Sequence, residues 1–130
     1  MLLLDTHVVV WITLSPSRLS KNAVRAIDGA RRQARGLFIS DVSLLELAGL
    51  VARKRIELQV SLESFLEEVE SHFAVLPINR RIAARSVQLP SSYPKDPMDR
   101  AIAATALVEG FPLVTADEGI QRSKAVKTIW

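Results

Sequence analysis

Short apolar runs alternate with longer segments of helical periodicity along this chain, and this alternation limits the possible folds more than any other feature. Each short run is typical of a strand buried on both faces; the runs cover residues 2–4, 37–39, 74–76, 113–115 and 126–130. Between them, apolar residues recur three and four positions apart over residues 44–52 and 62–73. We therefore predict an α/β protein, a three-layer α/β/α sandwich with a mainly parallel five-stranded sheet.

Start and stop signals support the intervening helices. Ser20 can cap a helix that runs to about residue 34, and Ser61 can cap another. Residues 79–89 are expected to form a short basic helix, and Asp96-Pro97 is a strong start signal for a helix with small residues over 101–108. Residues 8–12 are mostly β-branched, which leaves them open between helix and strand.

Length and composition exclude several classes of protein. A chain of 130 residues is enough for one domain, which we expect to span 1–130. Cysteine is absent, so disulfides and thiolate chemistry are excluded, and a metal would have to be bound by oxygen or histidine. No apolar run approaches the length of about 20 residues that crosses a membrane, and the apolar start lacks the positive charge of a signal peptide. We expect a cytoplasmic protein without a membrane segment.

Acidic residues gather where a parallel sheet places its sites. Ligands in such sheets bind outside the carboxyl ends of the strands. Asp5 ends the first strand, Glu46 lies early in the helix after the second, and Asp117 follows the fourth. Asp96 and Asp99 begin the helix before the fourth strand. All five carboxylates could therefore converge at one edge of the sheet.

Such a group of carboxylates needs a cation, because like charges raise one another's pKa and cost stability. Ligation by oxygen alone suits Mg²⁺ or Mn²⁺, which keep water ligands and bind phosphates. The chemistry that follows is hydrolysis of a phosphodiester by a metal-activated water.

Structural interpretations of the same acids remain open at this stage. Asp5 could cap the following helix, Asp117-Glu118-Gly119 could form an ordinary turn, and capping is the better interpretation for Asp96. Ser43 to Glu46 fits a capping box, which would make Glu46 structural. Their joint placement favours the functional interpretation.

Neighbouring polar and aromatic residues are assigned accessory roles or none. Thr6 and Thr115 could orient a ligand beside Asp5 and Asp117 or satisfy backbone groups, and Arg100 could hold a substrate phosphate or pair with a carboxylate. His7 is more typical of a local hydrogen-bonding residue than of a ligand. Trp11 and Trp130 are expected in the core or an interface rather than as base-stacking platforms.

The net charge supports a division of the surface. The chain has seventeen basic residues, twelve of them Arg, and fourteen acidic residues, so its net charge is +3. Without the five proposed site acids nine acids remain, so the rest of the chain carries +8. A basic body of this kind can attract a polyanion to a concentrated acidic pocket.

Taken together, four sequence blocks resemble the PIN domain family, and within it the VapC toxins of toxin–antitoxin pairs. The blocks are Leu3-Leu4-Asp5-Thr6-His7, Ser43-Leu44-Leu45-Glu46-Leu47-Ala48, Asp96-Pro97-Met98-Asp99-Arg100-Ala101-Ile102-Ala103-Ala104-Thr105-Ala106 and Leu113-Val114-Thr115-Ala116-Asp117. They occur in family order and span nearly the whole chain. His7 is a departure, because many PIN domains have Ser or Asn there.

The resemblance implies a metal-dependent endoribonuclease. Asp5, Glu46, Asp99 and Asp117 match the acidic quartet of the family, and Asp96 matches an accessory acid. By analogy Asp5, Asp99 and Asp117 would hold Mg²⁺ or Mn²⁺ directly or through water, and Glu46 would orient or deprotonate the attacking water. Expected products are a 5′-phosphate and a 3′-hydroxyl. The resemblance also implies a homodimer and a cognate antitoxin that covers the cleft.

Two alternatives are weighed against this function. A phosphatase of the haloacid dehalogenase type also opens with an apolar strand that ends in Asp, but its second Asp would stand where this chain has His7. The other is a PIN-like module that binds RNA or protein without cutting, since a fold does not fix a function. The complete acidic quartet argues against the second.

Overall fold

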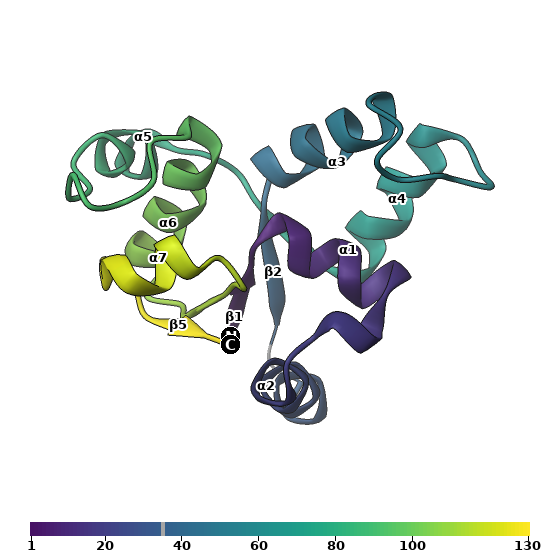
Figure 1. Ribbon diagram of the computed structural model, residues 1–130, viewed down its shortest axis with the longest axis horizontal. Helices are drawn as coiled ribbons and strands as arrows, with labels where there is room; N and C mark the ends of the chain where they lie inside the picture. The colour runs from purple at the N-terminus through teal and green to yellow at the C-terminus, as the bar shows by residue number, and fades with distance from the viewer. Residues whose placement is uncertain (35) are drawn as a thin grey trace.

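A single parallel sheet organises the molecule (Figure 1). The structure is a computed structural model that describes residues 1–34 and 36–130. Within these residues five strands pair in the order β3-β2-β1-β4-β5, all parallel. They are β1 (Leu2–Leu4), β2 (Leu37–Ser40), β3 (Ala74–Leu76), β4 (Leu113–Val114) and β5 (Thr128–Ile129). The predicted fold class is confirmed, and the sheet is wholly parallel.

Helices cover both faces of this sheet. One face carries α1 (Thr6–Leu14), α2 (Lys21–Arg32), α3 (Val42–Ala52) and α4 (Leu62–His72), and the short 3₁₀ helix η1 (Pro16–Arg18) follows α1. The other carries α6 (Pro97–Glu109) and α7 (Glu118–Ser123), with α5 (Arg80–Ser86) packed on α6. None of the helices in the described residues is long and apolar enough to cross a membrane.

The central strand shows why the apolar runs are continuous. Leu2 and Leu4 belong to the hydrophobic cluster under α1–α4, whereas Leu3 belongs to the cluster under α6 and α7. Successive side chains of a strand point to opposite faces, so a strand covered on both sides must be apolar at every position. The strand then ends at Asp5, on the edge where the polar residues begin.

Local structure differs from the sequence expectation at two places. Residues 8–12, left open between helix and strand, lie within α1, which is capped by Asp5 and buries Val8 and Val9 against the sheet. Asp117 to Gly119, expected to be a turn, is instead the cap and first turn of α7. In both cases an acid that accepts a backbone N–H starts a helix directly after a strand.

Candidate active site

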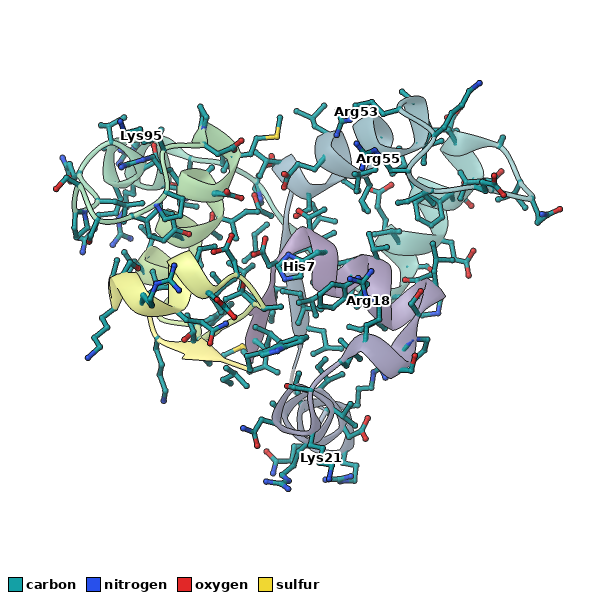
Figure 2. All side chains as sticks on the ribbon, in the orientation of Figure 1. His7, Arg18, Lys21, Arg53, Arg55 and Lys95 are labelled. Carbon is teal, nitrogen blue, oxygen red and sulfur yellow. The ribbon has the colours of Figure 1, made fainter. Side chains whose placement is uncertain are left out.

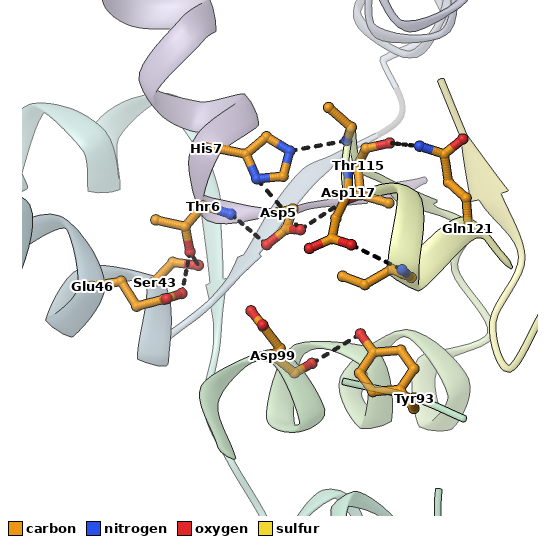
Figure 3. Close-up of polar contacts among 12 residues, drawn as sticks. Asp5, Thr6, His7, Ser43, Glu46, Tyr93, Asp99, Thr115, Asp117 and Gln121 are labelled. Carbon is orange, nitrogen blue, oxygen red and sulfur yellow. Dashed lines mark hydrogen bonds and ion pairs between the residues drawn. The ribbon is translucent and has the colours of Figure 1, made fainter. Parts of the chain in front are cut away.

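Asp5 lies at the centre of the site, between β1 and α1 (Figure 3). Its side chain is buried, at 4% exposed, and both carboxylate oxygens accept a hydrogen bond. Oδ1 accepts from the backbone N–H of Thr6 at 2.9 Å, and Oδ2 accepts from the hydroxyl of Thr115 at 2.8 Å. Asp5 therefore caps α1 and is also fixed toward β4, so its structural and functional interpretations are compatible.

Thr6 connects Asp5 to the next acid. Its hydroxyl donates to Oε1 of Glu46 at 2.5 Å and lies 2.9 Å from the hydroxyl of Ser43. The capping box proposed for Ser43 and Glu46 is wrong, because the N-cap position of α3 is Asp41 and Ser43 lies inside the helix. Ser43 is fully buried on Thr6, and Glu46 extends toward Asp5 instead of toward its own backbone. Glu46 is thus held by a neighbouring segment of the chain.

Thr115 joins Asp5 to Asp117. The Thr115 hydroxyl, which is fully buried, donates to Asp5 and accepts the backbone N–H of Asp117 at 3.1 Å. Oδ1 of Asp117 accepts from the N–H of Ile120 at 3.0 Å and caps α7. Thr115 therefore satisfies a backbone group, one of the two roles expected for it, and both threonines also donate to a carboxylate of the site.

The N-terminus of α6 brings two further acids to the same edge. Oδ1 of Asp96 accepts from the N–H groups of Met98 and Asp99 at 2.8 and 3.2 Å, which confirms its capping role. Asp99 is the third residue of α6, and its backbone carbonyl accepts a hydrogen bond from the hydroxyl of Tyr93 at 3.2 Å. Its carboxylate faces those of Asp5 and Asp117 in Figure 3.

Arg100 does not pair with a carboxylate among the described residues, which was one of the two roles expected for it. Its guanidinium donates to the backbone carbonyls of Ser86 and Tyr93, each at 3.4 Å. It therefore connects the end of α5 and the loop before α6 to that helix.

His7 fastens α1 to the loop that carries Asp117. Its Nε2 accepts the backbone N–H of Ala116 at 2.9 Å, and its Nδ1 lies 3.6 Å from Oδ2 of Asp5. Because Nε2 is the acceptor, the proton of the neutral ring is assigned to Nδ1, which faces Asp5. The local hydrogen-bonding interpretation of His7 is confirmed.

Electrostatics confirm that the acids interact. The pKa of Asp99 is raised to about 7, first by burial and then by the charges of Asp5, Asp96, Glu46 and Asp117. The pKa of Glu46 is also raised, mainly by burial, while its hydrogen bond from Thr6 opposes the shift. The charges of the other four predicted carboxylates thus all reach Asp99, which agrees with the convergence that the topology predicts.

The donor set fits a hydrated, hard cation. Among the described residues, Arg122 forms an ion pair with Glu118, the neutral His7 lies 3.6 Å from Asp5, and no Lys or Arg pairs with the acidic quartet. Within the same residues no three His, Asp or Glu side chains are grouped closely enough to hold an ion by themselves. Mg²⁺ is usually bound through one or two carboxylates and keeps several waters, which agrees with acids that are gathered but individually fixed by hydrogen bonds.

A cleft of about 600 Å³ is lined by four of the five acids, all but Asp117, and continues between α1 and α3. Besides Asp5, Glu46, Asp96 and Asp99, three arginines line it. Figure 2 shows Arg53 and Arg55 beside α3 and Arg18 beside α1. The sequence indicated basic clusters but not that Arg18, Arg53 and Arg55 share a cleft with the acids, because Arg18 is far from the others along the chain.

Comparison with known proteins agrees with this architecture. The family model described as PIN domain matches residues 2–126. Ribonuclease VapC22 of Mycobacterium tuberculosis is 38% identical over 130 residues, covering 98% of this chain and 97% of the relative. The crystal structure of FitAcB from Neisseria gonorrhoeae superposes with a TM-score of 0.69 at 26% identity, over 98% of this chain and 96% of that one. VapBC2 from Rickettsia felis, bound to a DNA fragment from its promoter, gives a TM-score of 0.72 at 16% identity, over 97% and 95% of the two chains. This chain therefore belongs to the PIN domain family.

Proposed function

We propose that this protein is a metal-dependent endoribonuclease, the toxin of a toxin–antitoxin pair, which hydrolyses phosphodiester bonds of RNA in the cytoplasm. The observation that carries the proposal is the convergence of four acids at one edge of the sheet, where the charges of Asp5, Glu46 and Asp117 all reach Asp99, without a Lys or Arg partner among the described residues. The name of the 38% identical relative, a ribonuclease, supports the same activity.

Asp5, Asp99 and Asp117 are the residues that would hold the metal, directly or through water. The ion is Mg²⁺ or Mn²⁺, since the donors are carboxylate oxygens and the chain has no cysteine. When bound, it supplies Lewis-acid stabilisation of the phosphate oxygens and a more acidic water. Thr115 holds Asp5 and Asp117 next to each other through its hydroxyl group, and His7 holds the loop that precedes Asp117 against α1.

Glu46 is the residue proposed to orient the attacking water and accept its proton. Thr6 fixes one carboxylate oxygen of Glu46, and burial favours the protonated form that results from the transfer. The water oxygen bonds to phosphorus while the bond to the 3′-oxygen breaks. The leaving oxygen takes a proton from solvent, so the products are a 5′-phosphate and a 3′-hydroxyl.

Two protein partners complete the proposal, a cognate antitoxin and a second copy of the chain. Both rest on the resemblance to VapC toxins. The antitoxin would cover the cleft, so the nuclease must be tested after its removal.

Cleavage of RNA by the protein freed of its antitoxin tests the function. We expect cleavage with Mg²⁺ or Mn²⁺, 5′-phosphate ends in the products, and loss of cleavage in Asp99→Asn. RNA that binds but stays intact under all these conditions would favour the non-cleaving PIN-like module. Undiminished cleavage by folded Asp5→Asn and Asp99→Asn would contradict the assigned site.

A further inference from the structure

The cleft that holds the acids has a second half that the proposed chemistry does not use. One wall of this half is the face of α1 that carries His7 and Trp11, one helical turn apart. Along α1, Trp11 lies about 9 Å from Asp5, six residues at 1.5 Å each. The second half therefore begins next to the position that a scissile phosphate would occupy.

Trp11 and Arg18 form a stacked pair on this wall. The guanidinium carbon of Arg18 lies 4.4 Å from the centroid of the Trp11 ring. Trp11 is half-buried and is supported by Trp130 at 5.6 Å and by His7 at 4.9 Å between ring centroids. Arg18 is exposed at the end of η1 and makes no ion pair with an acid in the described part of the chain. A rigid aromatic base therefore presents an uncompensated, planar cation to the cleft.

The opposite wall is basic as well. Arg53 and Arg55, both exposed, line the cleft from the end of α3. A methyl group at Gly49 would lie 3.1 Å from Nη1 of Arg53, so this guanidinium lies back along α3 over a position without a side chain. The positive charge of Arg53 reaches Glu46, where it opposes the raised pKa. Three arginines thus surround the part of the cleft that leads away from the acids.

We propose that the Arg18–Trp11 pair is a stacking site for one nucleobase of single-stranded RNA next to the scissile phosphate, with Arg53 and Arg55 binding the adjacent backbone phosphates. Guanidinium planes and aromatic rings are the groups on which proteins stack unpaired bases, and a guanidinium backed by a ring is already ordered for this contact. This proposal rests on the proposed nuclease function, and it assigns the part of the cleft in which the RNA strand binds. It also changes the expected role of Trp11 from core residue to the base of a substrate site.

Binding of short, single-stranded RNA containing one abasic nucleotide tests this site. The affinity is measured by fluorescence anisotropy in the Asp99→Asn background, with the abasic position moved along the strand. We expect one abasic position to weaken binding about tenfold, and Arg18→Ala to weaken binding of the intact RNA about tenfold. When the abasic nucleotide at that position is combined with Arg18→Ala, the affinity should still fall only about tenfold, because both changes remove the same contact.

Arg18 is the principal variant because it is exposed and its loss should not disturb folding. Arg25→Ala is the matched control, since Arg25 is exposed on α2 and does not line the cleft. In the cleaving enzyme, Arg18→Ala should raise KM about tenfold with little change in kcat, and Arg25→Ala should change neither. Trp11→Phe should keep most of the affinity that Trp11→Leu loses.

Additive losses at every abasic position, or an unchanged affinity in Arg18→Ala, would overturn the stacking site while leaving the nuclease function intact. Loss of antitoxin binding with normal RNA binding would also overturn it and would assign the pair to the protein partner. Conversely, non-additive RNA binding by a wild-type protein that does not cleave would support the stacking site and contradict the nuclease function.

Discussion

Replacing Asp99 by asparagine should stabilise the metal-free protein at neutral and alkaline pH, although it removes a proposed metal ligand. In the absence of metal, burial and four neighbouring acids raise the pKa of Asp99 from 3.8 to about 7. When folding raises the pKa of a carboxyl group, the protein becomes less stable as the pH rises, because the folded state binds the proton more tightly than the unfolded state does. Asparagine has the same shape and carries no charge, so it avoids this loss.

The size of the effect follows from the shift. Three pKa units correspond to about 4 kcal/mol at 1.36 kcal/mol per unit, which is an upper limit for a half-buried, strongly coupled group. Solvent screening and relaxation of the neighbouring acids should reduce this to about 1–2 kcal/mol. The lost interaction of a charged Asp99 with the N-terminus of α6 acts in the opposite direction but is worth only about 0.3–1 kcal/mol. The repulsion should therefore dominate.

Urea unfolding of metal-free wild type and Asp99→Asn between pH 4 and pH 8 measures the effect. The two proteins should have similar free energies of unfolding near pH 4. Between pH 3.8 and about 7 the variant should become increasingly more stable than wild type, and above pH 7 the difference should stay constant. Added Mg²⁺ or Mn²⁺ should stabilise wild type more than the variant. An equally stable or less stable variant at pH 8 would refute the reasoning.

Asp5→Asn is the matched control for this experiment. Both oxygens of Asp5 accept hydrogen bonds in a buried position, and asparagine offers only one oxygen. One buried group would be left without its partner, at a cost of about 1–3 kcal/mol. We therefore expect Asp5→Asn to destabilise the protein under the conditions in which Asp99→Asn stabilises it.

Three further predictions concern the metal, Thr6 and Arg100. EDTA should stop cleavage while circular dichroism at 25 °C still shows the folded protein, because the metal serves catalysis and both hydrophobic clusters form without it. Loss of the folded circular dichroism spectrum together with the activity would contradict this. Thr6→Val should lower kcat about ten- to a hundredfold with little change in KM, and cost about 1–3 kcal/mol in urea unfolding, because Ser43 and Glu46 lose a buried partner. Arg100→Ala should lower the free energy of unfolding by about 1 kcal/mol without raising the KM for RNA, because the Arg100 guanidinium binds backbone carbonyls. A large rise in KM would instead support the binding of a substrate phosphate by Arg100.

The sheet and most helices could be predicted because their signals are local. Ser20, Ser61 and Asp96 cap helices where the sequence predicts them, each by accepting a backbone N–H two or three residues ahead. The β-branched residues 8–12 were ambiguous because their helical state depends on the sheet, against which Val8 and Val9 are fully buried. The helix after Asp117 was missed because its six residues carry too short an apolar pattern.

The acidic edge was predictable from topology, whereas its hydrogen bonds were not. Parallel strands bring their carboxyl ends together, which places Asp5 and Asp117 side by side whatever the intervening sequence. The contacts of Thr6 with Ser43 and Glu46 span 37 and 40 residues and depend on how α3 packs beside α1. A local motif suggested a capping box there, and tertiary packing overrode it.

The distribution of hydrogen bonds among the acids explains where the electrostatic cost of the site falls. Asp5, Asp96 and Asp117 each accept a backbone N–H at the start of a helix, an arrangement that stabilises the charged form. Glu46 and Asp99 receive no such N–H within the described part of the chain, and burial, together with the charges of neighbouring acids, raises the pKa of both. Helix capping and metal binding are therefore not alternatives here. Capping fixes Asp5, Asp96 and Asp117, whereas Asp99 and Glu46 bear the cost of burial and of the neighbouring negative charges, which a bound cation would relieve.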